Sequence, residues 1–142
     1  MNDGSFTQLL AENLAANTTY TLTVDIGRRS DVQFTAPDIR LGYGTNPADL
    51  LMPTSSLAPT PVNGQWAVWQ DVFTTGANPT GLGQSLRIDL VSFDVQVSFD
   101  NVRLTAVSLE SAAVPEPTTL TLTSLAGLSG MLIRRRRSRK AV

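Results

Sequence analysis

The chain has 142 residues, enough for one domain with a hydrophobic core and too few for two domains of ordinary size. It contains neither Cys nor His, which excludes disulfides, thiolate nucleophiles, Cys/His zinc sites and catalysis by histidine. The net charge of −1 is the sum of −6 for residues 1–113, which have five arginines and eleven carboxylates, and +5 for residues 114–142. Because the body of the chain is acidic, it is not expected to bind nucleic acid.

Residues 18–100 consist of short β segments separated by Gly, Pro and Asn, with no long stretch of helical periodicity. Residues 19–26 alternate strictly, with Tyr20, Leu22, Val24 and Ile26 on one face, which predicts a half-buried strand. Residues 7–16 fit either a strand or a short helix. We predict the remaining strands at 39–43, 50–52, 66–74, 86–91 and 95–109. Together they predict an all-β domain over residues 1–110, an antiparallel β-sandwich of jelly-roll type.

In the last predicted strand, the apolar residues change from odd-numbered to even-numbered positions. Its apolar residues are odd-numbered up to Phe99 and even-numbered from Val102, so a β-bulge at Asp100 and Asn101 would keep both halves facing the core. The segment 98–104, Ser-Phe-Asp-Asn-Val-Arg-Leu, resembles the closing strand of carbohydrate-binding-module and galactose-binding-like jelly rolls. This resemblance implies that Asp100 helps to hold a structural calcium ion. The alternative is that Asp100 is simply a polar residue of the bulge.

Three aromatic residues are candidates for stacking on a sugar ring. Trp66 and Trp69 are three apart in a predicted strand, so one is expected in the core and the other nearer the surface. Tyr43, between two glycines, is the third candidate. The alternative for each is an ordinary packing role, which is the commoner one in a sandwich.

The C-terminal region has three features in a fixed order. The first is a Pro-Glu-Pro motif, Val114, Pro115, Glu116 and Pro117, within a linker at 111–117. Sixteen uncharged residues follow at 118–133, which as a helix would span roughly 24 Å, a short transmembrane segment. The third is a basic tail at 134–142, whose cluster orients the segment with this end in the cytoplasm: Arg134, Arg135, Arg136, Arg137, Arg139 and Lys140. The alternative is a buried core helix, but the segment has no charged face.

This order closely resembles the PEP-CTERM sorting domain of exported proteins of Gram-negative bacteria. The resemblance implies an exosortase and, transiently, the inner membrane as partners, with delivery to the cell surface or to an exopolysaccharide matrix. Export requires a leader, and the first six residues have neither a basic nor an apolar region, so we expect that the natural N-terminus lies upstream and that the first strands of the sandwich are missing.

From the sequence alone, the expected function is that of a noncatalytic exported protein that binds exopolysaccharide or another glycan. A purely structural matrix or adhesion protein is one alternative. The other is a small glycoside hydrolase or lyase that uses two of four aspartates on separate segments, Asp25, Asp38, Asp71 and Asp89.

Overall fold

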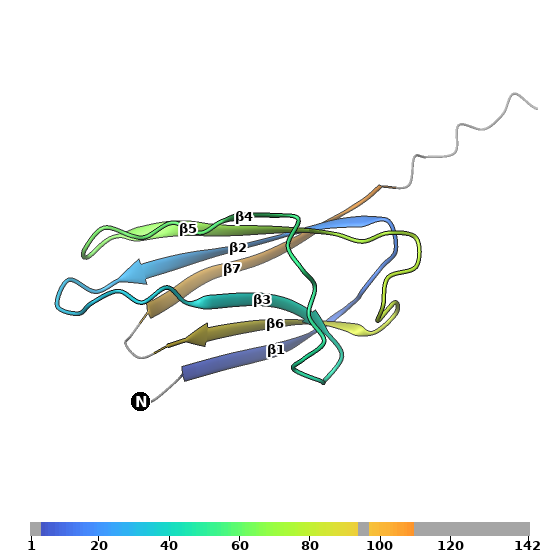
Figure 1. Cartoon of the computed structure of the whole chain (residues 1–142), viewed down its shortest axis with the longest axis horizontal. Helices are drawn as coiled ribbons and strands as arrows, with labels where there is room; N and C mark the ends of the chain where they lie inside the picture. Colours follow the sequence, from blue (N-terminus) through green and yellow to red (C-terminus); the bar gives the residue numbers. More distant parts are fainter. Residues whose placement is uncertain (1–3, 94–96, 110–142) are drawn as a thin grey trace, which may run out of the picture. The chain divides into compact units, whose positions relative to one another are not determined.

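Two antiparallel sheets face each other in the computed structural model, which describes residues 4–93 and 97–109 (Figure 1). One sheet has the strand order β1-β6-β3 and the other the order β4-β5-β2-β7. The strands are β1 (Gly4–Asn13), β2 (Thr18–Arg28), β3 (Asp38–Tyr43), β4 (Ser55–Leu57), β5 (Trp66–Thr74), β6 (Ser85–Ser92) and β7 (Val97–Ser108). The predicted all-β sandwich is therefore confirmed.

Strand β2 is the centre of the larger sheet, where it pairs with β5 on one side and β7 on the other. Its alternation is the one that the sequence predicts: Tyr20, Leu22, Val24 and Ile26 are at most 2% exposed. These side chains pack between the sheets against the apolar residues of β3 and β6. Burial of each such side chain contributes about 1.5–3 kcal/mol, so the alternating face of β2 is a substantial part of the core.

The predicted β-bulge in the last strand is confirmed. The pairing of β7 with β2 shifts between Thr23 and Asp25, opposite Asp100 and Asn101, and Asn101 has a φ of 53°. Phe99 and Leu104, on either side of the shift, both pack against the core. The extra residue thus lets both halves of β7 face inward.

Two short segments differ from the sequence prediction. Residues 50–52 do not form a strand; Leu50 makes a single bridge to Gly42. The edge strand β4 lies instead at Ser55–Leu57, where two serines and Leu57 are all exposed, so no apolar alternation marks it. The ambiguous segment at 7–16 is largely the edge strand β1, paired with β6.

Arg87 of β6 fixes the loop after β3. Its side chain is 2% exposed, its Nε donates to Asp89 at 2.9 Å, and its two Nη atoms donate to the main-chain oxygens of Tyr43, Gly44, Asn46 and Asp49 at 2.7–3.3 Å. Gly42 provides the space for this arrangement, because a Cβ atom there would lie 2.5 Å from the Asp49 oxygen and 2.6 Å from Arg87. The loop at 44–49 is thereby held against the outer face of its sheet.

The three C-terminal predictions, a linker at 111–117, an apolar helix at 118–133 and a basic tail, lie outside the described residues. Within residues 4–93 and 97–109, no helix is long and apolar enough to cross a bilayer.

Candidate functional site

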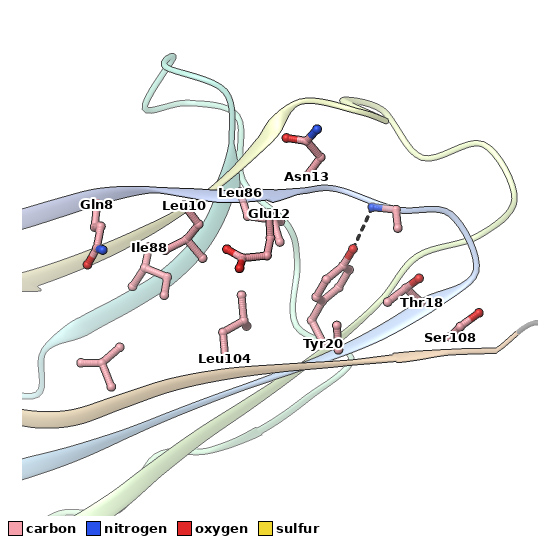
Figure 2. Close-up of a pocket in the computed structure, with 13 residues that line it drawn as sticks. Gln8, Leu10, Glu12, Asn13, Thr18, Tyr20, Leu86, Ile88, Leu104 and Ser108 are labelled. Atoms are coloured by element: carbon pink, nitrogen blue, oxygen red, sulfur yellow. Dashed lines mark hydrogen bonds between the residues drawn. The ribbon is translucent and has the colours of Figure 1, made fainter.

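A cavity lies between the two sheets, at the side where β1 and β7 are the edge strands (Figure 2). Its volume is about 730 Å³. The apolar part of its wall comes from four strands: Leu10, Tyr20, Leu86, Ile88, Val102, Leu104 and Ala106. The polar side chains gather on β1 and at the end near the β1–β2 turn: Gln8, Glu12, Asn13, Thr18 and Ser108. The cavity is thus a mainly apolar chamber with polar groups on one side.

Glu12 is the carboxylate of this cavity. Figure 2 shows its side chain directed from β1 into the space between the sheets, above Leu104 of β7. The pairing of β1 with β6 shifts between Leu9 and Asn13, so Glu12 lies at an irregularity of the edge strand. Such irregularities redirect side chains at the rims of sheets. Among the described residues, Glu12 has no hydrogen-bond or ion-pair partner, so its carboxylate is available to a ligand.

Tyr20 supplies the second polar group. Its ring is 2% exposed, and its oxygen accepts a hydrogen bond of 2.7 Å from the backbone N–H of Ala15, drawn as a dashed line in Figure 2. A phenol accepts through its oxygen and still carries one proton to donate. No acceptor for that proton is found among the described residues. The hydrogen bond from Ala15 therefore fixes the position of the Tyr20 hydroxyl. The hydroxyl proton remains available for a hydrogen bond to a ligand.

The cavity has the size and composition of a site for a small, mainly apolar molecule. Small-molecule sites have volumes of roughly 300–1,000 Å³ and apolar walls with a few polar groups that orient the ligand. A carboxyl group can give or take a proton, and a tyrosine hydroxyl can stabilise a developing negative charge. Binding of a small apolar compound and proton transfer to it are chemistry that this arrangement supports.

The three aromatic residues predicted as sugar platforms lie in separate places. Trp66 is on the outer face of its sheet, 55% exposed, with its ring against Gly27. Trp69 faces inward and donates from Nε1 to Asp71 at 2.8 Å. Tyr43 is buried in the core. One tryptophan is thus inside and the other outside, as predicted, but the three rings do not form one surface.

Asp100 lies on β7 opposite Asp25 of β2. The side-chain amide of Asn101 donates to the Asp25 carboxylate at 3.1 Å, and the backbone N–H of Asn101 donates to Asp100 at 2.7 Å. Two carboxylates and an amide therefore meet at the bulge. Asp100 and Asn101 are exposed, Asp25 is half-buried, and none of the three is part of the wall of the cavity.

The four aspartates considered for a glycosidase have different surroundings. Asp89 pairs with the buried Arg87, and Asp38 pairs with Arg40. Asp25 lies at the bulge, and Asp71 is buried between the sheets. Two of them, Asp38 and Asp71, line a second cavity near β3 and β5. Asp25, Asp38 and Asp89 each have a polar side chain as partner and Asp71 accepts only from Trp69, so the group as a whole does not converge.

Glu12 and Tyr20 were not among the candidate site residues predicted from the sequence. The only local signal is the sequence Gln8, Leu10, Glu12 at alternate positions, which places polar groups on what becomes an inner face of β1. That signal is readable only once residues 7–16 are known to be a strand rather than a helix.

The sequence model of the HpiC1-like family, described as HpiC1 cyclase, matches residues 1–105. No curated protein matches the chain.

Solved structures of cyclases from Fischerella sp. TAU are similar in sequence and fold. One is 29% identical with a TM-score of 0.61, over 74% of this chain and 56% of that chain. The Stig cyclase Fisc in complex with (3Z)-3-(1-methyl-2-pyrrolidinylidene)-3H-indole is 30% identical with a TM-score of 0.60, over 73% and 56%. A complex with 4-(1H-indol-3-yl)butan-2-one is also 30% identical with a TM-score of 0.60, over 74% and 57%. The chain thus spans little more than half the length of these cyclases.

These similarities correct the family and function predicted from the sequence. The body matches a family of cyclases, so the assignment to a sorting-domain protein with a carbohydrate-binding body, and the prediction of a noncatalytic matrix protein or a glycosidase, are wrong. The motif at Val114–Pro117 and the basic cluster at Arg134–Lys140 lie beyond the matched residues and outside the described ones. They are local to the tail and therefore carry no information on the chemistry of the body.

The predicted partners are also wrong. Exosortase, the inner membrane and exopolysaccharide were inferred from the tail, whereas the ligands held by two of the similar cyclases are small indole compounds. Export and an upstream leader stay predictions.

Proposed function

Because this chain belongs to the HpiC1-like cyclase family, we propose that it binds an indole-bearing substrate in the cavity between β1 and β7 and promotes its cyclisation by proton transfer. The observation that carries the proposal is the position of Glu12, an exposed carboxylate on the edge strand β1 that has no partner among the described residues and is directed toward a largely apolar cavity of about 730 Å³. The indole compounds bound by two similar cyclases support the class of substrate.

Cyclisation of such a substrate involves two proton transfers, one to the substrate and one from it. The carboxyl group of Glu12 gives its proton to an electron-rich atom of the substrate, which makes a neighbouring carbon electrophilic. The indole ring attacks that carbon and the new C–C bond closes the ring. The carboxylate then takes the proton released when the indole regains its aromaticity, so the overall reaction is an isomerisation.

The other cavity residues position the substrate in this scheme. Leu86, Ile88 and Leu104 exclude water and contact the flat faces of the ring. The Tyr20 hydroxyl, fixed by Ala15, donates to a substrate heteroatom. Holding the reacting carbons close together is itself a large part of the catalysis of ring closure.

Filling the cavity is expected to weaken indole binding. Ala106 of β7 lines the cavity opposite Tyr20, and Ala106→Phe places a ring in the proposed substrate volume. We expect the affinity for 4-(1H-indol-3-yl)butan-2-one, measured by calorimetry, to fall about tenfold or more, equivalent to about 1.4 kcal/mol. Val68→Phe, on the exposed outer face of the same sheet, is the control and should leave affinity unchanged. Equal affinity of the two variants would place the substrate elsewhere.

Asp100 is proposed to hold a calcium ion together with Asp25. The two residues are register partners at the bulge of β7, and carboxylate and amide oxygens are the ligands that calcium prefers. Within residues 4–93 and 97–109 no group of three or more Asp, Glu, His or Cys residues is arranged for a metal, so other ligands such as water would complete the shell. At a calcium concentration about a hundred times Kd, stability should rise by about 2.7 kcal/mol. A thermal-shift titration checks this, and an equal shift in Asp100→Asn would contradict it.

A further inference from the structure

A second cavity, of about 560 Å³, lies along the other open side of the sandwich. Its wall comes from the edge strands β3 and β4, from β5, and from the loop that connects β3 to β4. Most of the wall is apolar, including Ile39, Leu51, Met52 and Phe73. None of its lining residues is shared with the cavity of Glu12.

Asp71 of β5 is the unusual residue of this second cavity. Asp71 is 3% exposed. One of its carboxylate oxygens accepts a hydrogen bond of 2.8 Å from the indole N–H of Trp69. The other oxygen, Oδ1, is buried and has no hydrogen-bond partner in the described part of the chain. A buried carboxylate oxygen without a donor carries an uncompensated desolvation cost. Its presence in a cavity wall indicates that a donor comes from outside the chain.

The charges around the cavity favour a cationic donor. Arg40 also lines it, but its guanidinium donates to Asp38 through two nitrogens, and this pairing raises the pKa of Arg40 above its ordinary value. Asp38 and Arg40 therefore offset each other. Asp71 is left as the one unpaired charge among the lining residues that the structure describes, and the net charge of the wall is −1.

We propose that this cavity binds an apolar ammonium compound, with the ammonium N–H donating to Oδ1 of Asp71 and the apolar part packed against Trp69, Phe73 and the loop. An ammonium group supplies both the missing donor and the opposite charge, and its hydrogen bond to a carboxylate is of the strong, charge-assisted kind. The aromatic ring of Trp69 adds a favourable face for the cation. The site is separate from the proposed cyclisation cavity and does not depend on that function.

The fluorescence of Trp69 can report on this site. The chain has two tryptophans, so Trp66→Phe, on the outer face, leaves Trp69 as the sole one. In this background, 2-phenylethylammonium should change the Trp69 emission and bind roughly tenfold to a hundredfold more tightly than 2-phenylethanol, because its hydrogen bond to Asp71 is charge-assisted. The anion 3-phenylpropanoate, of similar shape, should bind more weakly than the alcohol.

Asp71→Asn in the same background should abolish the preference for the ammonium over the alcohol. Asp31→Asn, which removes the same charge from an exposed loop, should keep it. If 2-phenylethylammonium and 2-phenylethanol bind the Trp66→Phe protein equally, the proposal is wrong whether or not Asp71→Asn folds. A preference that persists in folded Asp71→Asn would also overturn it. Neither outcome bears on indole binding between β1 and β7.

Discussion

Replacing Glu12 with glutamine is expected to lower the rate of cyclisation by about 10²–10⁴-fold, the usual contribution of a general acid–base group. Glutamine has nearly the same shape and keeps a hydrogen-bonding oxygen, but it can neither donate nor accept the transferred proton. The apolar wall of the cavity is unchanged, so binding of 4-(1H-indol-3-yl)butan-2-one should stay within about twofold of the unsubstituted protein. The rate is followed by mass-resolved chromatography of an indole-bearing substrate and its cyclised isomer.

The matched control for this loss is Asp31→Asn. Asp31 is exposed and pairs with Arg29 outside both cavities, so its substitution removes one negative charge without touching either site. It should leave the cyclisation rate unchanged. A Glu12→Gln protein that binds the ketone and also cyclises at the full rate would show that another group transfers the proton.

Replacing Arg87 with methionine is expected to lower the free energy of unfolding by about 3–5 kcal/mol, the cost of removing one member of a buried ion pair. The substitution leaves the carboxylate of Asp89 buried without its partner. It also removes the arginine donor from four main-chain oxygens of the 43–49 segment, of which those of Asn46 and Asp49 each keep a backbone N–H donor. Methionine restores much of the volume of the arginine stem, so the loss reports mainly on the polar contacts.

Urea unfolding followed by circular dichroism measures this change. Arg103→Met on β7 is the control, because Arg103 is exposed and its substitution should shift stability by no more than about 0.5 kcal/mol. The double variant Arg87→Met, Asp89→Leu should recover part of the loss, since it removes the unpaired charge. Equal stabilities of Arg87→Met and Arg103→Met would mean that the 44–49 loop is held by other contacts.

The strands that the sequence predicted well are those with one buried face. Residues 19–26 alternate without exception, and residues 66–74 coincide with β5. The parity change at Asp100 located the bulge, because side chains of a strand with one buried face must return to that face. Edge strand β4 was missed since three exposed residues, two serines and Leu57, give no alternating pattern.

The candidate site was not predictable in the same way. Glu12 and Ala106 are more than ninety positions apart, and they share a cavity only because β1 and β7 are edges of opposing sheets. Pairing β1 with β6 rather than with its sequence neighbour β2 is a long-range choice that no local pattern records. The carboxylate of Glu12, which is exposed on the edge strand β1, could therefore not be assigned to the rim of a cavity.

The function was misread because the two ends of the chain carry different kinds of signal. The tail has a motif of four consecutive residues, Val114–Pro117, that by itself resembles a sorting tag. The relation of the body to the cyclases is spread over residues 1–105 at about 30% identity, with no short motif that stands alone. In a single sequence a short motif is easier to recognise than a similarity spread over a whole domain, even when the motif does not indicate what reaction the domain catalyses.

The hydrogen bonds from Arg87 to the loop at 44–49 have a consequence for how related proteins can diverge. Its guanidinium binds only main-chain oxygens in that loop, which every amino acid provides. Side chains such as Pro47 and Ala48, which line the second cavity, can therefore be exchanged while the path of the loop is inherited. Selection can then alter the preference of this cavity by single substitutions, without first having to find a new backbone.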